Sequence, residues 1–198
     1  MSPRALALLL VLALGSSAHA GGGAVKGTVT TSDHAPVADS VVMIEGPSVP
    51  ALPTAPHLVM EQRHETFAPR VLAVPTGTTV DFPNHDPVLH NVFSASPAKK
   101  FDLGMYDQGE TKSVTFDTAG VVRVGCNVHP KMEAFIVVHP NPYVAVTDAH
   151  GGYTITGVPA GSYQVRVWHE RLAERQIPVV VRDGQVQPLD LQLAKPPR

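Results

Sequence analysis

Proline and glycine interrupt this chain so often that long regular elements are disfavoured over most of its length. The sequence contains 19 prolines and 16 glycines, and the runs between them are short and rich in valine and threonine. Proline breaks helix interiors, whereas β-branched residues suit strands. The middle of the chain shows no convincing helical period. The pattern therefore predicts an all-β protein of short strands joined by tight turns.

The first 20 residues form a separate unit. Arg4 precedes an apolar run from Ala5 to Leu14, and the segment ends in the small residues of Ala18-His19-Ala20. These are the parts of a secretory signal peptide, and the apolar run is too short to span a membrane with such flanks. We therefore expect residues 1–20 to be removed, the mature protein to be soluble with no membrane span, and its location to be the periplasm.

The charge of the chain excludes one large class of partners. The formal net charge is −2, and loss of Arg4 with the signal peptide makes it one unit more negative. A nucleic-acid-binding protein needs a basic footprint, and a peripheral membrane protein often carries a polybasic patch. Neither feature is present in the sequence. No nucleic-acid partner is expected.

Strand and turn signals divide the mature chain into segments. Residues 21–46 contain two strand candidates around a turn at Ser32–Pro36, which predicts a hairpin-like pair with alternating burial. Residues 47–56 hold four prolines and predict a stiff linker and a change of domain. Residues 57–140 offer strand candidates typical of a β-sandwich, at Arg70–Val74, Thr78–Phe82, Asn91–Ser94, Lys112–Phe116, Gly120–Gly125 and Ala134–His139. Residues 141–198 add strands at Tyr163–Val167, Ile177–Val181 and Val186–Leu193.

The chemistry of the chain is concentrated in two short segments of the middle region. Cys126, His129 and Met132 follow one another in a C-x2-H-x2-M run, and His90 lies upstream in His-Asn-Val-Phe. Two imidazoles, one thiolate and a weak axial thioether are the ligand set of a mononuclear blue-copper site. The site also explains why an exported protein keeps its single cysteine unpaired. We predict one type 1 copper ion bound by these four residues.

Other histidines give weaker signals. His57, His64 and His85 leave open a second copper site, although their spacing matches no metal signature closely. His85 could compete with His90 as a ligand, but it lies in a predicted turn. The remaining histidines with no assigned role are treated as surface residues, namely His34, His139, His150 and His169. Trp168 is interpreted as a packed indole, with partner docking as the alternative.

The segments around the metal-binding residues resemble the cupredoxins, the blue copper proteins of the amicyanin and plastocyanin type. Val80-Asp81-Phe82, the His90 segment and the Cys126 to Met132 loop carry this resemblance. It implies a Greek-key β-sandwich with His90, Cys126 and His129 as equatorial ligands, Met132 as the axial ligand and the backbone of Asn91 near the thiolate. It also implies that electrons pass through His129, which reaches the surface in an apolar patch.

The flanking segments resemble a different family. Thr147-Asp148 with Gly151-Gly152-Tyr153, followed by Gly157-Val158-Pro159 and Tyr163, is similar to the carboxypeptidase-regulatory-like, or transthyretin-like, β-sandwich. The opening strands of that fold match Gly27 to Val42. This implies a small sandwich split by an inserted cupredoxin domain, at 21–46 and 141–198 around 57–140. The combination also resembles periplasmic proteins of the methylamine-utilisation type.

Three functions remain open from the sequence. The first is an exported one-electron carrier that cycles between Cu(I) and Cu(II) and docks around His129, Pro130 and Lys131 with a cytochrome or dehydrogenase. The second is a copper chaperone or sensor that binds Cu(I) with the same ligands. The third is an adhesion or assembly module that has lost its metal. We expect no enzyme, because the cysteine is already assigned to the metal and no hydrolase, P-loop or H-E-x-x-H motif occurs. The sequence does not indicate the oligomeric state.

Overall fold

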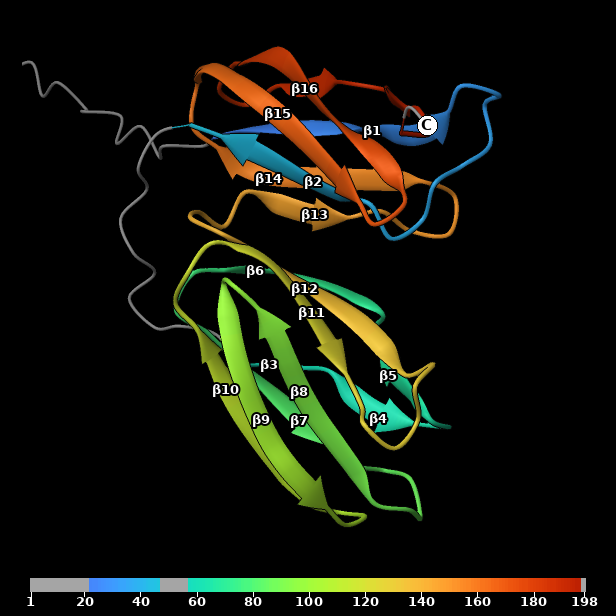
Figure 1. Cartoon of the computed structure of the whole chain (residues 1–198). Coiled ribbons are helices and arrows are strands. Elements are labelled where there is room, and N and C mark those ends of the chain that lie inside the picture. Colours follow the sequence, from blue (N-terminus) through green and yellow to red (C-terminus); the bar gives the residue numbers. More distant parts are fainter. Residues whose placement is uncertain (1–21, 47–56, 197–198) are drawn as a thin grey trace, which may run out of the picture.

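The computed structural model describes residues 22–46 and 57–196, and in these ranges every regular element is a β-strand. The strands form two stacked sandwiches (Figure 1). The predicted all-β architecture of two sandwiches is thereby confirmed. The described part of the chain contains no helix that could cross a membrane. The predicted signal peptide at 1–20 and the predicted linker at 47–56 lie outside the described residues.

The metal sandwich, as we call the body formed by β3 to β12, comes from the middle of the chain. Its larger sheet has the order β6-β12-β11-β8-β9 and its smaller sheet the order β10-β7-β3, while β4 and β5 form a separate hairpin. The strands of the larger sheet are β6 (Val71–Pro75), β8 (His90–Ser96), β9 (Lys99–Tyr106), β11 (Gly120–Gly125) and β12 (Glu133–His139). The others are β3 (His57–Val59), β4 (Glu61–Arg63), β5 (Thr66–Ala68), β7 (Thr78–Pro83) and β10 (Thr111–Phe116).

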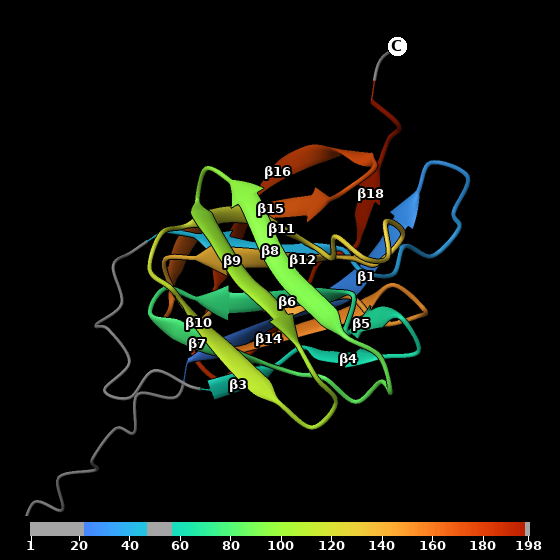
Figure 2. The same cartoon turned by 60° about the horizontal axis from the view of Figure 1, so that its bottom comes forward.

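The flanking sandwich is built from both ends of the described chain. In one sheet β1 pairs with β14, β17 and β18, and the other sheet has the order β13-β2-β15-β16. The strands are β1 (Gly23–Thr31), β2 (Val41–Glu45), β13 (Val144–Val146), β14 (Gly152–Val158), β15 (Gly161–His169), β16 (Leu172–Val181), β17 (Val186–Pro188) and β18 (Leu191–Leu193). Figure 2 shows these two ends of the chain lying on the same side of the metal sandwich.

The predicted hairpin of the N-terminal segment is wrong. β1 and β2 belong to different sheets, and their apolar residues meet across the core of the flanking sandwich, where Val25 and Val29 face Val42 and Ile44. The predicted alternating burial also fails for β2, whose first four residues are all buried. The reason is that β2 is covered on both faces, since Val41 and Met43 point into a second cluster shared with the metal sandwich.

The predicted strand from Val186 to Leu193 is interrupted. Leu189 approaches the opposing strand so closely that a Cβ on Gly27 would lie 1.9 Å from its carbonyl oxygen. Leu189 donates to the Lys26 carbonyl, and the Asp190 carboxylate accepts hydrogen bonds from the backbone and hydroxyl of Thr28. These contacts bend the chain between β17 and β18, and the absence of a side chain at Gly27 makes the approach possible.

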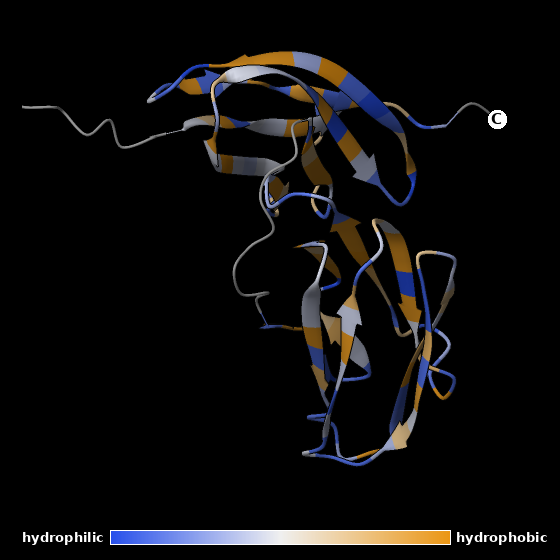
Figure 3. Ribbon diagram, turned by 90° about the vertical axis from the view of Figure 1, so that its left-hand side faces the viewer, coloured by the Kyte–Doolittle hydropathy of each residue, from blue (hydrophilic) through white to orange (hydrophobic). Residues whose placement is uncertain are grey.

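The six strands predicted between residues 70 and 139 are present with limits shifted by one or two residues at most. Apolar and polar residues alternate along several of them, as the bands in Figure 3 show. In β7, for example, Thr78, Val80 and Phe82 are buried while the intervening residues are partly exposed. β9 was not predicted, although its first six residues alternate between partly buried and exposed, and Gly104 in its interior adopts a positive φ of 65°.

The two sandwiches share an apolar layer. Residues of β2 and β15 pack against residues of β6 and β12, and the rings of Phe135 and Trp168 lie 5.4 Å apart. The Arg70 guanidinium lies over the Phe135 ring and forms an ion pair with Glu170. Trp168 is only 8% exposed, which confirms the interpretation of a packed indole.

The prediction that His139 is a surface residue is wrong. Its side chain is fully buried at the end of β12, where the ring Nε2 lies 3.5 Å from the Glu45 carboxylate of β2. The neighbouring Asn141 is also buried and donates to the Ile44 carbonyl. The flanking sandwich covers this end of β12, and the sequence of β12 alone contains no sign of that cover. His34 and His150 are exposed as predicted, while His169 is half-buried.

Candidate metal centre

Strand pairing brings the two predicted ligand segments together. β8 and β11 are antiparallel neighbours, with Gly125 opposite Phe93. The start of β8, at His90, therefore lies at the same edge of the sheet as the end of β11, which Cys126 follows directly. The sheet, rather than the sequence distance, decides that these residues meet.

A tight turn then returns the chain to the same edge. The backbone N–H of Met132 donates to the His129 carbonyl at 2.8 Å, and β12 begins at Glu133, which pairs with Gly125. The turn carries His129 back over Cys126 and leaves Met132 buried in the same apolar cluster as the cysteine. All four predicted ligands thus lie at one end of the metal sandwich.

Three of the four donor groups converge. The Nδ1 atoms of His90 and His129 lie 3.2 Å apart, and the Cys126 sulfur lies 3.9 Å from His90 Nδ1. The ligand atoms of these three residues all lie within 4.8 Å of one another. Donor atoms bound to one ion at metal–ligand distances of about 2.0–2.3 Å are themselves separated by roughly 3.2–4.0 Å. The arrangement therefore has the dimensions of a single-ion site.

Burial differs between the two histidines. His90 is 0% exposed and Cys126 is 5% exposed, whereas the His129 side chain is 24% exposed. Met132 is also buried. The cluster is thus sealed on the side of His90 and open to solvent at the ring of His129.

Asp86 determines which nitrogen of His90 faces the cluster. Its carboxylate lies 2.8 Å from His90 Nε2, and both side chains are buried. A carboxylate accepts hydrogen bonds only, so Nε2 carries the proton and Nδ1 presents its lone pair toward Cys126 and His129. Carboxylate–histidine pairs of this kind orient metal-binding imidazoles and raise their basicity.

The same carboxylate anchors the β4–β5 hairpin. Its two oxygens accept the backbone N–H groups of His64 and Glu65 at 2.6 and 2.8 Å. Burial raises the pKa of the Asp86 carboxyl, but the hydrogen bonds from Glu65, His90 and His64 outweigh it, so the pKa lies below its ordinary value. Asp86 is therefore ionised at neutral pH and joins the hairpin to the buried histidine.

Further polar groups lie buried behind His90. Tyr106 is the strand partner of His90, and its hydroxyl donates to the Phe82 carbonyl and accepts from Gln62. Asn84 donates to the Tyr106 carbonyl and accepts from the Asp86 backbone. Burial raises the pKa of Tyr106 far above its ordinary value, so the phenol stays neutral.

Asp86 and its network were not predicted from the sequence. The available signal was an acidic residue four positions before a candidate ligand histidine, next to His85 in the predicted turn. Asn91 was expected near the thiolate through its backbone, and its side-chain oxygen accepts the N–H of Asn127 at 3.3 Å, which ties β8 to the ligand turn.

The alternative histidines lie outside the cluster. His85 Nε2 lies 3.4 Å from the Glu61 carboxylate, and His57 Nδ1 lies 3.3 Å from the Asp81 carboxylate. His64 occupies the hairpin turn, where its backbone is bound by Asp86. Among the residues described by the structure, His90, Cys126 and His129 form the one group of three or more acidic, histidine or cysteine donors.

The donor set fits copper. One thiolate and one thioether are soft ligands that favour Cu(I), and imidazole accepts either oxidation state. Two Nδ1 atoms that face each other at 3.2 Å share either one proton or one cation, because two bare lone pairs would repel. The residues present are therefore compatible with a copper ion held between them.

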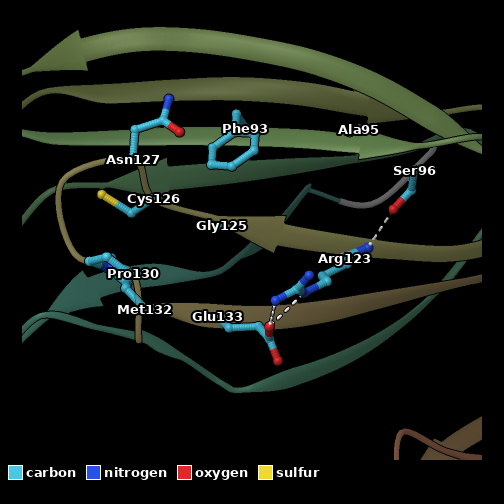
Figure 4. A pocket seen from close by; sticks show the side chains of 10 residues that line it. All are labelled: Phe93, Ala95, Ser96, Arg123, Gly125, Cys126, Asn127, Pro130, Met132 and Glu133. Atoms are coloured by element: carbon cyan, nitrogen blue, oxygen red, sulfur yellow. Dashed lines mark hydrogen bonds and ion pairs between the residues drawn. The ribbon is translucent and has the colours of Figure 1, made fainter.

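A groove lies beside the cluster on the outer face of the larger sheet. Its volume is about 510 Å³, and Figure 4 shows Phe93, Gly125 and Pro130 along it, with Arg123 and Glu133 paired at one end. The Cys126 sulfur points away from that ion pair (Figure 4). A Cβ at Gly125 would lie 3.2 Å from the Phe93 ring, so the missing side chain keeps the groove floor open.

Comparison with known proteins finds both families that the sequence motifs resemble. A family model described as the carboxypeptidase regulatory-like domain matches residues 119–194. This range includes β11 and β12, which the structure pairs with β8 and β6 of the metal sandwich. The limits predicted at 57 and 140 stay a prediction. No curated protein matches the chain by sequence.

Among solved structures, the chain is similar in part to three copper proteins. A Cu(I) amicyanin variant shares 24% identity, with a TM-score of 0.40 over 42% of this chain and 82% of that one. A purple cupredoxin from Nitrosopumilus maritimus shares 25% identity, with a TM-score of 0.38 over 43% and 100%. A copper-containing nitrite reductase from Thermus scotoductus SA-01 shares 26%, with a TM-score of 0.41 over 49% and 25%.

These findings agree with the two resemblances drawn from the sequence. The chain is similar in part to cupredoxins, and residues 119–194 match a carboxypeptidase regulatory-like domain.

Proposed function

We propose that this protein is an exported type 1 copper protein that carries single electrons. The observation that supports the proposal most is the convergence of His90 Nδ1, Cys126 Sγ and His129 Nδ1, with the His90 tautomer held by a buried carboxylate. The thioether of Met132, which is buried in the same apolar core as Cys126, would complete the set as the weak axial ligand. When bound, copper supplies a centre that alternates between Cu(I) and Cu(II).

The chain's own residues hold the donors in place and exclude water. His90 is fixed by Asp86, Cys126 follows a central strand, and His129 is set by the turn that closes at Met132. Rigid donors need little rearrangement between the two oxidation states, and this favours rapid electron transfer. Burial of His90 and Cys126 keeps solvent from the inner side of the site.

The surface around His129 suits contact with a redox partner. Four of the exposed large apolar residues belong to segments beside the ligands: Val88 and Leu89 precede His90, Met105 pairs with Asn91, and Val128 precedes His129. Exposed apolar residues gathered on one surface mark protein interaction sites. We propose that a cytochrome or dehydrogenase docks on this apolar patch and exchanges electrons through His129.

The test is a visible absorption and EPR spectrum of the mature protein with one equivalent of Cu(II). The proposal expects an intense thiolate-to-copper band and a narrow copper hyperfine splitting. The copper should also remain bound while the protein exchanges electrons with a cytochrome. A colourless protein, or ordinary tetragonal copper signals, would contradict the carrier function. Transfer of copper to an apo-acceptor would instead support the chaperone alternative.

A further inference from the structure

A β-bulge interrupts the pairing of β8 with β9 next to the candidate ligands. Asn91 lies opposite Met105 and Phe93 lies opposite Asp102, so two steps along β8 correspond to three along β9. Gly104, inside this interval, has a φ of 65°, a conformation that favours glycine. Bulges are frequent next to active sites, where they redirect a side chain. The bulge in β9 begins at Asp102.

One oxygen of the Asp102 carboxylate accepts two hydrogen bonds. Its Oδ1 accepts the backbone N–H of Gly104 at 2.8 Å, which closes the bulge, and the side-chain amide of Asn91 at 2.7 Å. Asp102 is exposed on β9, the edge strand of the larger sheet, whereas Asn91 is only 2% exposed. The carboxylate therefore connects the edge of the sheet to a buried amide that directly follows His90 in the chain.

This contact determines how the Asn91 amide is oriented. A carboxylate only accepts hydrogen bonds, so the Nδ2 group of Asn91 must face Asp102. The amide oxygen then faces the other way and accepts the backbone N–H of Asn127 at 3.3 Å. In the flipped orientation two acceptors would meet at Asp102 and two donors at Asn127. The carboxylate thus selects the one orientation in which Asn91 bonds both neighbours.

The far end of this chain of hydrogen bonds is the residue after the thiol. Asn127 follows Cys126 where β11 has ended and the ligand turn begins (Figure 4). Residues 127, 128, 130 and 131 of the turn are exposed, so side-chain packing contributes little to holding its first half. The hydrogen bond to the buried Asn91 amide is therefore a main restraint on the backbone beside Cys126.

We propose that Asp102 is a positioning residue for the metal centre, acting through Asn91 on the backbone next to Cys126. Hydrogen bonds outside the ligand shell of a metal site orient the ligands, and their loss lowers metal affinity. Asp102 lies one bond further out than such direct partners, so its effect should be smaller than theirs. The inference rests on the proposed copper-protein function.

The experiment compares Asp102→Asn with Asp102→Ala in the mature protein. Both variants lose the exposed negative charge, but the asparagine keeps an Oδ1 that can accept from Asn91 and Gly104, whereas the alanine does not. The difference between the two variants therefore reports the hydrogen bonds and not the charge. Copper affinity is measured by competition with a chelator of known affinity, and the blue band and the copper hyperfine splitting are recorded for each variant.

We expect Asp102→Ala to bind Cu(II) about 3–10-fold more weakly than Asp102→Asn, below the roughly 10–100-fold lost with a direct partner of a ligand. Its blue band should also shift, because the thiolate is held less firmly. Asp102→Asn should keep the affinity and the band of the unmodified protein. Equal affinities and identical spectra for the two variants would refute the inference.

A further variant separates the contact with Asn91 from the support of the bulge. In Asp102→Ser the hydroxyl can still accept the Gly104 N–H two residues ahead, but the side chain is too short to reach Asn91. It should lose as much affinity as Asp102→Ala, and it serves if the alanine variant does not fold. Lys100→Ala, an exposed change two residues away on β9, is the control and should keep the affinity.

The pair Asp102→Asn and Asp102→Ala is then repeated in an Asn91→Ala background. If Asp102 acts through Asn91, the two double variants should bind copper equally, because residues in one hydrogen-bonded chain do not act additively. A difference that persisted would show that Asp102 acts by another route and would overturn the inference alone. Absence of the blue band from the unmodified protein would overturn the proposed function, and the inference with it.

Discussion

The two sandwiches bury different kinds of residue, and the difference indicates which of them carries function. In the flanking sandwich the buried polar residues are Ser40, Asn141 and Thr147, none of which is ionisable. The metal sandwich has a similar apolar core, but one end of it also buries His90, Asp86, Asn84 and Gln62. Buried polar groups contribute less to stability than apolar ones unless they are fully paired. Their concentration at one end indicates a site maintained for chemistry.

Charged residues also differ between the two sandwiches. In the flanking sandwich, ion pairs such as Arg166 with Glu45 lie on strand surfaces or at the contact between the sandwiches. In the metal sandwich, the ionised Asp86 is buried and binds two backbone groups and a candidate ligand. A buried charge needs such partners, because its desolvation is otherwise very costly. The following predictions test the contrast, from the largest expected effect to the smallest.

Replacing the thiolate should have the largest effect. Cys126→Ala should abolish the blue absorption band completely, because that band requires a copper–thiolate bond. Titration with Cu(II), monitored by visible absorption, checks this. His85→Ala is the matched control and should keep the band. The ligand assignment would be wrong if His85→Ala bleached the protein and His90→Ala did not.

Removing the indole at the contact between the sandwiches should make the two sandwiches unfold in separate transitions. Trp168→Ala deletes a buried ring that packs on Phe135 and should destabilise the protein by about 3–5 kcal/mol. The blue band should persist, since Trp168 is not part of the donor cluster. Denaturant unfolding followed by far-ultraviolet circular dichroism and by copper absorption measures both, since Trp168 is the single tryptophan of the chain and its fluorescence is lost in the variant. As a control, Leu191→Ala in the flanking core should destabilise without separating the two unfolding transitions.

Neutralising the buried carboxylate tests whether the buried polar groups beside the candidate ligands support metal binding. Asp86→Asn should weaken copper binding roughly 10–100-fold, because the amide lacks the negative charge and the second oxygen with which the carboxylate holds the His90 Nε2–H group. Competition with a chelator of known affinity measures the change. An affinity equal to that of the unmodified protein would show that Asp86 only anchors the hairpin. Asp81→Asn, which removes an exposed carboxylate of the same sandwich, is the control.

The smallest effect concerns the ion pair between the sandwiches. Burial raises the pKa of Glu170, but the Arg70 guanidinium outweighs it and holds the pKa below its ordinary value. A depressed pKa means that the pair stabilises the fold above the unfolded-state pKa of about 4.3 and that this stability is lost as the pH falls through the folded-state value. Glu170→Gln should therefore cost about 1–2 kcal/mol at pH 7, and this cost should shrink as the pH falls below the unfolded-state pKa toward the lower folded-state one.

Urea unfolding of the unmodified protein and of Glu170→Gln, measured between pH 7 and pH 3, checks the prediction. The difference in free energy of unfolding between them should narrow only below about pH 4. A constant difference at all pH values would mean that packing, rather than charge, is responsible. The blue band should be unaffected, since Glu170 belongs to the contact between the sandwiches.

Much of the fold could be predicted from local patterns. Proline and glycine define the turns, and alternation along β7 or β15 is visible in the sequence because a strand with one buried face repeats every two residues. The hairpin of β1 and β2 was mispredicted because neighbouring strands in sequence can lie in facing sheets, and the sequence does not record which sheet a strand joins. β2 has two buried faces, so it lost the alternation that would have identified its side.

The sequence alone determined the residue types available for the site and their order: a cysteine, a histidine and a methionine within one short turn, and a second histidine before a strand. Because these three residues lie in one short turn, their spacing in the sequence limits how far apart their side chains can lie. Only the tertiary structure decided that His90 meets it, because antiparallel pairing of β8 and β11 joins residues distant in sequence. It also decided the contacts of Asp86 and the burial of His139, since burial and electrostatic partners depend on elements that pack from elsewhere in the chain.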